Sequence, residues 1–298
     1  MSATAIASFV CVLLLLVGVA GYFYWTKRKN QGATPGASGA PLTGTDPPLS
    51  ADPTQTTKPE TITPPTWANG PTTWDKLSQA QHANNVTYLT AKVGSDESKP
   101  LDVVFYGDEL VQEMRRGEAT WKDKSPWLAV FPENEFRTAL LGVPGVGGSV
   151  EGLAWRLISG TERPRKDPKC LVLYVGKYNL ATKNAAPPAD LLKVLLTWLT
   201  KSMPTANIVV LGLLPDPKLG DVIKQTNAAY KQLVAEVNKE NGNMILYLDC
   251  AANVDPRSAP LFAKSSPSPN ETEAYKALHT AFFRCLLTTI KPLMDNSV

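Results

Sequence analysis

The chain has 298 residues, with 30 Lys and Arg against 27 Asp and Glu, and 43% of its residues are hydrophobic. This length accommodates one large domain and additional segments. The net charge of +3 is spread along the chain, and no basic stripe is interleaved with aromatic residues, so nucleic acid is excluded as an expected partner. No cysteine or histidine spacing typical of a metal site occurs, and we expect neither a metal nor a cofactor.

Residues 1–29 are predicted to form a membrane anchor with a basic flank. Residues 5–25 carry no charge and are long enough to cross the hydrocarbon core as one helix. They end in an aromatic belt, and Lys27-Arg28-Lys29 follow. The positive-inside rule then predicts a single-pass protein whose C-terminal domain faces the cytosol or an organellar matrix or stroma. Two sequons, at Asn85 and Asn270, would matter only in a lumenal domain, and we give the charge signal more weight.

Residues 30–73 are predicted to be a disordered tether, rich in Pro, Thr and Gly. This stretch has too few large apolar residues to offset the entropy lost on ordering. It is either a plain spacer or a docking site for a partner.

The four cysteines, Cys11, Cys170, Cys250 and Cys285, are far apart in the sequence and lie in apolar surroundings. We expect them to be buried free thiols in a reducing compartment.

From residue 74 onward, the hydrophobic pattern alternates between helix and strand. Predicted helices cover 74–89, 108–116, 150–158, 188–201, 221–239 and 271–293, and predicted strands cover 103–106, 138–142, 170–175, 208–211 and 244–248. The segment that holds Trp121, Trp127 and Phe131 is predicted to be irregular and packed by its aromatic side chains. This alternation predicts an α/β domain over residues 74–298, with a parallel sheet of about five strands between helices.

The first predicted strand ends in a sharp elbow. Gly107 allows the tight turn, Asp108 can cap the next helix, and Glu109 is lifted to the carboxyl edge of the sheet. Two further strand ends, at Gly148 and Asn179, are expected to converge on the same edge, where α/β proteins place their sites.

Several ordered blocks resemble the SGNH (G-D-S-L) hydrolases, and within them most closely the catalytic subunits of the intracellular platelet-activating factor acetylhydrolase. The blocks are Trp74 and His82, Asp102–Asp108, Gly145–Gly148, Trp155–Leu157, Val175–Asn179, Ile208–Pro215 and Leu278-His279. The resemblance implies an SGNH, flavodoxin-like three-layer sandwich and ester hydrolysis by a Ser-His-Asp triad. It also implies dimers.

The family's oxyanion hole maps onto Gly148 and Asn179, but its triad is not retained. Glu109 stands at the nucleophile position. The family's Asp-x-x-His block should lie shortly before Tyr275, where residues 262–272 contain neither Asp nor His. In that stretch, Ser265, Ser266 and Ser268 are the positions that stand where the family's Asp and His are expected.

The chain has only two histidines, His82 and His279, and neither occupies the catalytic position, so we expect structural roles for both. Two alternatives stay open for Glu109. In the first, its carboxylate points into the former oxyanion hole and accepts hydrogen bonds from Asn179 and backbone N–H groups. In the second, it faces solvent and interacts favourably with the dipole of the helix that it begins.

Three functions follow from these patterns. The favoured one is a membrane-anchored, catalytically inactive module that acts as a structural, scaffolding or binding subunit of a membrane complex, held by residues 5–25. The second is an esterase with a non-standard site that uses Glu109 as base or nucleophile. The third is a module that binds an acyl or lipid ligand without turnover.

Overall fold

The structure is a computed structural model of the chain, and it describes residues 74–94, 99–121, 125–182, 187–241, 245–253 and 272–295. Three predicted features, the anchor at 5–25, the tether at 30–73 and the serines at 265, 266 and 268, lie outside these residues. Within the described ranges, no helix is both long and apolar enough to cross a membrane.

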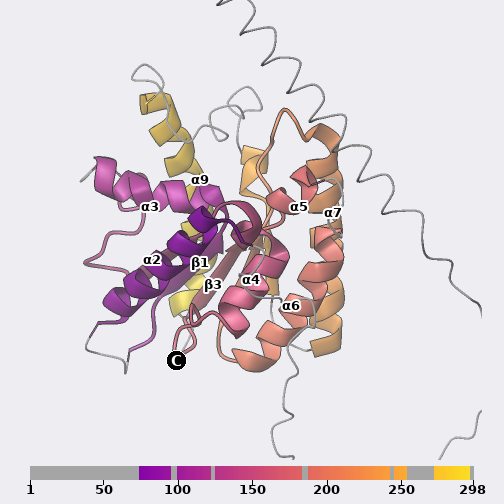
Figure 1. The fold of residues 1–298 in the computed structure, drawn as a ribbon, viewed down its shortest axis with the longest axis horizontal. Coiled ribbons are helices and arrows are strands. Elements are labelled where there is room, and N and C mark those ends of the chain that lie inside the picture. Colours follow the sequence, from indigo (N-terminus) through magenta and orange to yellow (C-terminus); the bar gives the residue numbers. More distant parts are fainter. Residues whose placement is uncertain are drawn as a thin grey trace, which may run out of the picture. The chain divides into compact units, whose positions relative to one another are not determined.

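Five parallel strands form one sheet, in the order β2-β1-β3-β4-β5 (Figure 1). The strands are β1 (Val103–Gly107), β2 (Thr138–Gly142), β3 (Cys170–Tyr174), β4 (Asn207–Leu211) and β5 (Ile245–Leu248). This order is that of flavodoxin-like sheets, and it confirms the prediction of a parallel five-stranded α/β fold.

Helices cover both faces of this sheet. They are α2 (Lys76–Val93), α3 (Glu109–Trp121), α4 (Val150–Ile158), α5 (Lys177–Ala181), α6 (Pro188–Ser202), α7 (Gly220–Asn241) and α9 (Thr272–Asp295), with 3-10 turns η3 (Gly145–Gly148) and η4 (Cys250–Asn253). In Figure 1, α3 and α9 lie on one side of the sheet and α4, α6 and α7 on the other. This is the arrangement that right-handed crossovers produce.

Three neighbouring strands, β2, β1 and β3, are buried along their whole length because they are covered on both faces. All five residues of β1, of β2 and of β3 are buried, as expected for the continuous apolar strands of a parallel sheet. Helix α6 begins at Pro188, a residue that suits a first helical turn. Its leucines, among them Leu192 and Leu199, enter the core.

The aromatic segment before β2 is packed as predicted, with one correction. The ring of Trp127 stacks on Phe131 with centroids 4.2 Å apart and meets the edge of Phe283 of α9 at 5.2 Å. Trp121, which was predicted to lie in this irregular segment, is the last residue of α3 instead. The hydrophobic periodicity of α3 fades after residue 116, and this is why the sequence did not reveal its full length.

The prediction of free thiols is wrong for two of the four cysteines. Cys250 of η4 and Cys285 of α9 form a disulfide, with Cα atoms 5.8 Å apart. Cys170 of β3 is a buried free thiol, and burial raises its pKa to about 12. Cys11 lies outside the described residues.

Candidate functional site

Three strand ends meet at the carboxyl edge of the sheet, as predicted. Gly107 at the end of β1 stands in register with Gly142 of β2 and with Tyr174 of β3. The loops that follow these strands therefore start at the same level. They lead into the elbow at Asp108, into η3 and into α5.

Asp108 is the buried centre of this edge. Its Oδ1 accepts a hydrogen bond from the backbone N–H of Leu110 at 2.9 Å, so it caps α3 as predicted. Burial, and then the neighbouring charge of Glu109, raise the pKa of Asp108 to about 7. A carboxyl group with this pKa changes its charge near neutral pH, although it is only 1% exposed.

Gly148 packs directly against Asp108. A Cβ atom at Gly148 would lie 2.9 Å from Cβ of Asp108 and 2.4 Å from the carbonyl oxygen of Val143. The structure thus brings Gly148 to the elbow, and only glycine fits there without a shift of the backbone.

Asn179 lies on the same edge, but its amide is occupied. Its Oδ1 accepts a hydrogen bond from the backbone N–H of Val150 at 3.1 Å, and its Nδ2 donates to Oε2 of Glu151 at 2.8 Å. Asn179 therefore holds the N-terminus of α4, and a carboxylate of this chain accepts a hydrogen bond from the amide that the resemblance assigns to an oxyanion hole.

Glu109 is exposed at the first position of α3. Among the hydrogen bonds of the described residues, Asn179 donates to Glu151 and not to Glu109. The alternative in which Asn179 donates to Glu109 is therefore wrong, and the arrangement is that of a solvent-facing carboxylate at a helix N-terminus, which the helix dipole favours.

Both histidines lie in structural positions. Nδ1 of His82 is 2.7 Å from Oε1 of Glu162, and its ring packs against Trp155 at 5.1 Å between centroids. His279 is buried in α9 with its ring 4.1 Å from that of Tyr275, and burial lowers its pKa to about 3. A buried neutral ring against an aromatic neighbour is a core position, which is the role that we expected.

A buried polar cluster ties the loops of the site together, and its acid, Glu162, was not among the predicted site residues. Arg156 donates two hydrogen bonds to Oε2 of Glu162, at 2.7 and 3.0 Å. It also donates to the carbonyl oxygens of Gly107 and Gly147, at 3.2 and 3.4 Å. One guanidinium thus holds the end of β1 to η3. No pattern could have located Glu162, because it lies in an irregular loop whose partners come from α2 and α4.

Asn85, the first sequon asparagine, belongs to the same cluster. It is fully buried, and its Nδ2 donates to the carbonyl oxygen of Gly142 at 3.2 Å and to Glu162 at 3.3 Å. The folded domain therefore has no room for a glycan on Asn85.

Two of the pockets on the described surface lie near the loops of the sheet. One, of about 460 Å³, lies behind the ends of β4 and β5, and its lining includes Leu213, Asp216, Ile223, Asp249 and Ala251. Asp216 forms an ion pair with Lys177, the first residue of α5 at the carboxyl edge of the sheet, and its Oδ2 lies 3.1 Å from Nζ. This pocket is therefore a neighbour of the candidate site.

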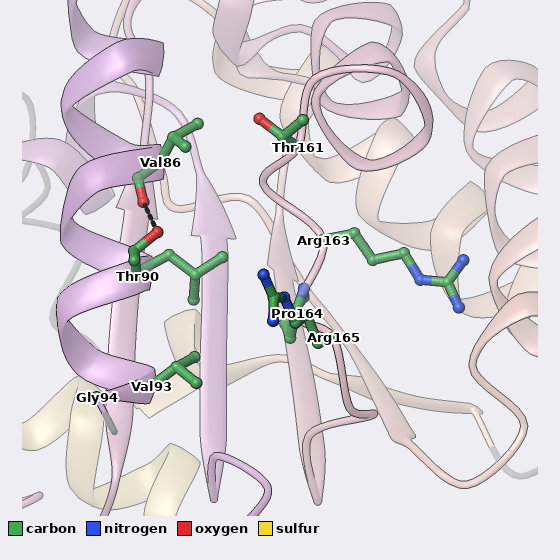
Figure 2. A pocket seen from close by; sticks show the side chains of 9 residues that line it. Val86, Thr90, Val93, Gly94, Thr161, Arg163, Pro164 and Arg165 are labelled. Atoms are coloured by element: carbon green, nitrogen blue, oxygen red, sulfur yellow. Dashed lines mark hydrogen bonds between the residues drawn. The ribbon is translucent and has the colours of Figure 1, made fainter. Parts of the chain in front are cut away.

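The other pocket, of about 420 Å³, lies between α2 and residues 161–165 (Figure 2). Val86 and Val93 point from α2 toward it, whereas Arg163 extends away from α2, and its Nη2 donates to the carbonyl oxygen of Ser202. Arg137, which precedes β2, donates to the carbonyl oxygen of Val93 at 2.9 Å, so this pocket reaches the N-terminal ends of the strands. It is separate from the candidate site.

The described residues contain no group of three or more His, Cys, Asp or Glu side chains that could hold a metal ion. The positions Ser265, Ser266 and Ser268, at which the resemblance places the lost Asp-x-x-His block, lie in residues 254–271, outside the described ranges.

Comparison with known proteins gives relatives of one kind. The chain is 33% identical to the platelet-activating factor acetylhydrolase IB subunit alpha1 of Rattus norvegicus over 144 residues, which are 48% of this chain and 56% of the relative. It is 32% identical to subunit alpha2 of Homo sapiens over 140 residues, which are 46% of this chain and 55% of the relative. The chain thus spans about half the length of the curated relatives it matches. No family model matches it.

Among solved structures, a GDSL-like lipase of Bacteroides thetaiotaomicron aligns with 78% of this chain and 100% of its own, at 14% identity and a TM-score of 0.44. On the sequence relationship to the acetylhydrolase subunits, the chain is related to the SGNH (GDSL) hydrolases.

Proposed function

We propose that this SGNH hydrolase-like domain is catalytically inactive and serves as a membrane-anchored structural, scaffolding or binding subunit of a membrane complex. Residues 5–25 would provide the anchor, and other proteins, a second copy of this chain among them, would be its partners. The activity in the names of the relatives is an ester hydrolysis, which in this family needs a nucleophile, a base and an oxyanion hole whose hydrogen-bond donors are open to the substrate.

The observation that carries the proposal is the position of the two histidines. The chain has only His82 and His279. The ring of His82 in α2 packs against Trp74 and Trp155, and the ring of His279 is buried in α9 against Tyr275. We infer from these positions that neither histidine serves as the base of a nucleophile at the elbow, and loss of the base alone removes most of a triad's rate advantage.

Two features at the elbow support the same conclusion. The nucleophile position holds Glu109, whose carboxylate would repel a developing oxyanion beside it. In addition, Nδ2 of Asn179 already donates to Glu151. An acyl oxygen bound at Asn179 would therefore lie close to a carboxylate of the protein, whose charge disfavours an oxyanion there.

The test is turnover of short-chain acyl esters by the full-length chain in detergent. The parent and Glu109→Gln are compared with Glu135→Gln, which neutralises an exposed glutamate outside the elbow. We expect no rate above the uncatalysed reaction for all three. Turnover by the parent and by Glu135→Gln that is lost in Glu109→Gln would instead establish the esterase with a non-standard site.

The pocket of about 460 Å³ favours one alternative, the binding of an acyl or lipid ligand without turnover. Its volume lies in the range of small-molecule sites, and apolar side chains such as Leu213 and Ile223 contribute to its lining. Binding of a neutral short-chain acyl ester is measured by calorimetry for the parent, for Ala251→Phe, which fills the pocket, and for Ala228→Phe, an exposed control on α7. Binding that only Ala251→Phe abolishes would favour the ligand-binding module.

A further inference from the structure

The disulfide between Cys250 and Cys285 joins two elements that are distant in the sequence. Cys250 opens η4 shortly after β5, and Cys285 lies in the middle of α9, at a sequence separation of 35. Their Cα separation of 5.8 Å is at the usual value for a disulfide. Cys250 is 1% exposed, so this cross-link belongs to the packed interior of the fold.

This cross-link fastens the edge of the sheet to the last helix. Strand β5 is a terminal strand of the sheet, and it has a neighbour only in β4. Helix α9 packs against η4, and the disulfide lies at that contact. A covalent bond at an edge strand stabilises the part of a sheet that has the fewest hydrogen-bonded partners.

Such bonds persist where the surroundings are oxidising. Structural disulfides are common in secreted, lumenal and periplasmic proteins and rare in the cytosol, where thiols are kept reduced. The third described cysteine, Cys170, is compatible with either condition, because it is buried in β3 and has no cysteine partner.

We propose that this domain folds in an oxidising compartment, on the side of the membrane opposite to the one that Lys27-Arg28-Lys29 predict. There the thiols of Cys250 and Cys285 lose two protons and two electrons to a donor disulfide by thiol–disulfide exchange. The donor is reduced to a dithiol, and the new S–S bond remains in the folded domain. This proposal does not depend on whether the domain is catalytic.

Asn85 limits the kinds of compartment in which the folded domain can reside. Because its Nδ2 is buried and donates to two oxygens, the folded domain requires that Asn85 stay unmodified. The compartment therefore either lacks N-glycosylation or leaves this sequon unused.

The test is the thiol state of the full-length chain in the cells that make it. Cells are quenched in acid, the chain is denatured and free thiols are blocked with N-ethylmaleimide. Disulfides are then reduced, and the released thiols are labelled with a second, heavier maleimide. Peptide mass spectrometry is expected to show the first label on Cys170 and the second on Cys250 and Cys285. The first label on Cys250 and Cys285, or a bond of either to another cysteine, would overturn the proposal.

A second measurement uses the purified full-length chain. Closing a loop of this length is expected to raise the melting temperature by roughly 10 °C. Reductant should lower the melting temperature of the parent and of Cys170→Ala by that amount, and should leave Cys250→Ser/Cys285→Ser unchanged. An equal response of the double variant and the parent would show that the bond does not stabilise the domain and would contradict a structural disulfide.

Discussion

Replacing Glu162 by Gln removes one negative charge from a cluster in which Glu162 and Arg156 are both fully buried. The carboxylate accepts hydrogen bonds from Arg156, His82 and Asn85. Removing one partner of a buried ion pair costs about 3–5 kcal/mol, because the remaining charge is left uncompensated. Gln keeps the shape and one acceptor oxygen, so we expect about 3 kcal/mol. At about 2–4 °C per kcal/mol, the melting temperature should fall by about 6–12 °C.

Urea unfolding followed by tryptophan fluorescence measures this loss at pH 7. The matched control is Glu133→Gln, which removes an exposed partner of Lys92 and should cost less than about 1 kcal/mol. A loss below about 1 kcal/mol for Glu162→Gln as well would refute the conclusion that this cluster holds the loops of the site.

The same variant has a signature in pH. Burial raises the pKa of Glu162, but Arg156 and His82 outweigh burial and hold the pKa below its ordinary value. The stability that the carboxylate contributes is therefore present above the unfolded pKa and is lost as the pH falls through the folded pKa. The difference between parent and Glu162→Gln should shrink as the pH falls below 4, and a constant difference would contradict this assignment.

Three further predictions concern the elbow and α9. The pKa of Asp108 is raised to about 7. The stability that its protonated form contributes to the fold is therefore lost as the pH rises from about 4 to 7. Asp108→Asn can still cap α3. Over that pH range, its free energy of unfolding should rise relative to that of the parent by at most about 4 kcal/mol, since a pKa raised by about three corresponds to 1.36 kcal/mol for each unit. Urea unfolding measures this difference. Gly148→Ala should lose about 1–3 kcal/mol in the same assay, because its Cβ would meet Asp108 and Val143. The stability that neutral His279 contributes should be lost as the pH falls from 6.5 toward 3, because His279 has a pKa of about 3 when folded and its ordinary value when unfolded. In thermal unfolding at a series of pH values, the parent should therefore lose stability relative to His279→Phe over that range.

Much of the fold could be predicted because its strands are short apolar runs. The residues of β1, β2 and β3 are buried on both faces, and such strands have a plain signature. The end of α3 and the short helix α5 were missed, because neither has a sustained apolar stripe. Gly176, just before α5, adopts φ 113°, and the hydroxyl of Tyr230 occupies the space that a Cβ atom there would need.

At the site, the sequence predicted which residues meet but not how their hydrogen bonds are used. Gly148 and Asn179 lie at the elbow edge as expected, because the ends of parallel strands are level. The acceptor of Asn179 is Glu151, in the first turn of α4, and not Glu109. Ser149 caps this helix by accepting a hydrogen bond from the N–H of Gly152. The place of Glu151 in the first turn of α4 was the one signal in the sequence that could have indicated its bond with Asn179.

The disulfide could not be predicted from spacing. Cys250 and Cys285 are separated by 35 residues, and only the packing of α9 on η4 brings them together.

The proposal that the elbow has no catalytic base is tested most directly by restoring the nucleophile. Turnover of short-chain acyl esters is measured for the full-length chain as parent, as Glu109→Ser, and as Glu109→Ser/Glu151→Gln, in which the side chain facing Asn179 is no longer charged. We predict that neither variant exceeds the parent or the uncatalysed rate, because neither substitution moves His82 from its place beside Trp155 in α2 or His279 from its place beside Tyr275 in α9. A rate for either variant that rises clearly above that of the parent, with an acyl group attached to Ser at position 109, would contradict the account.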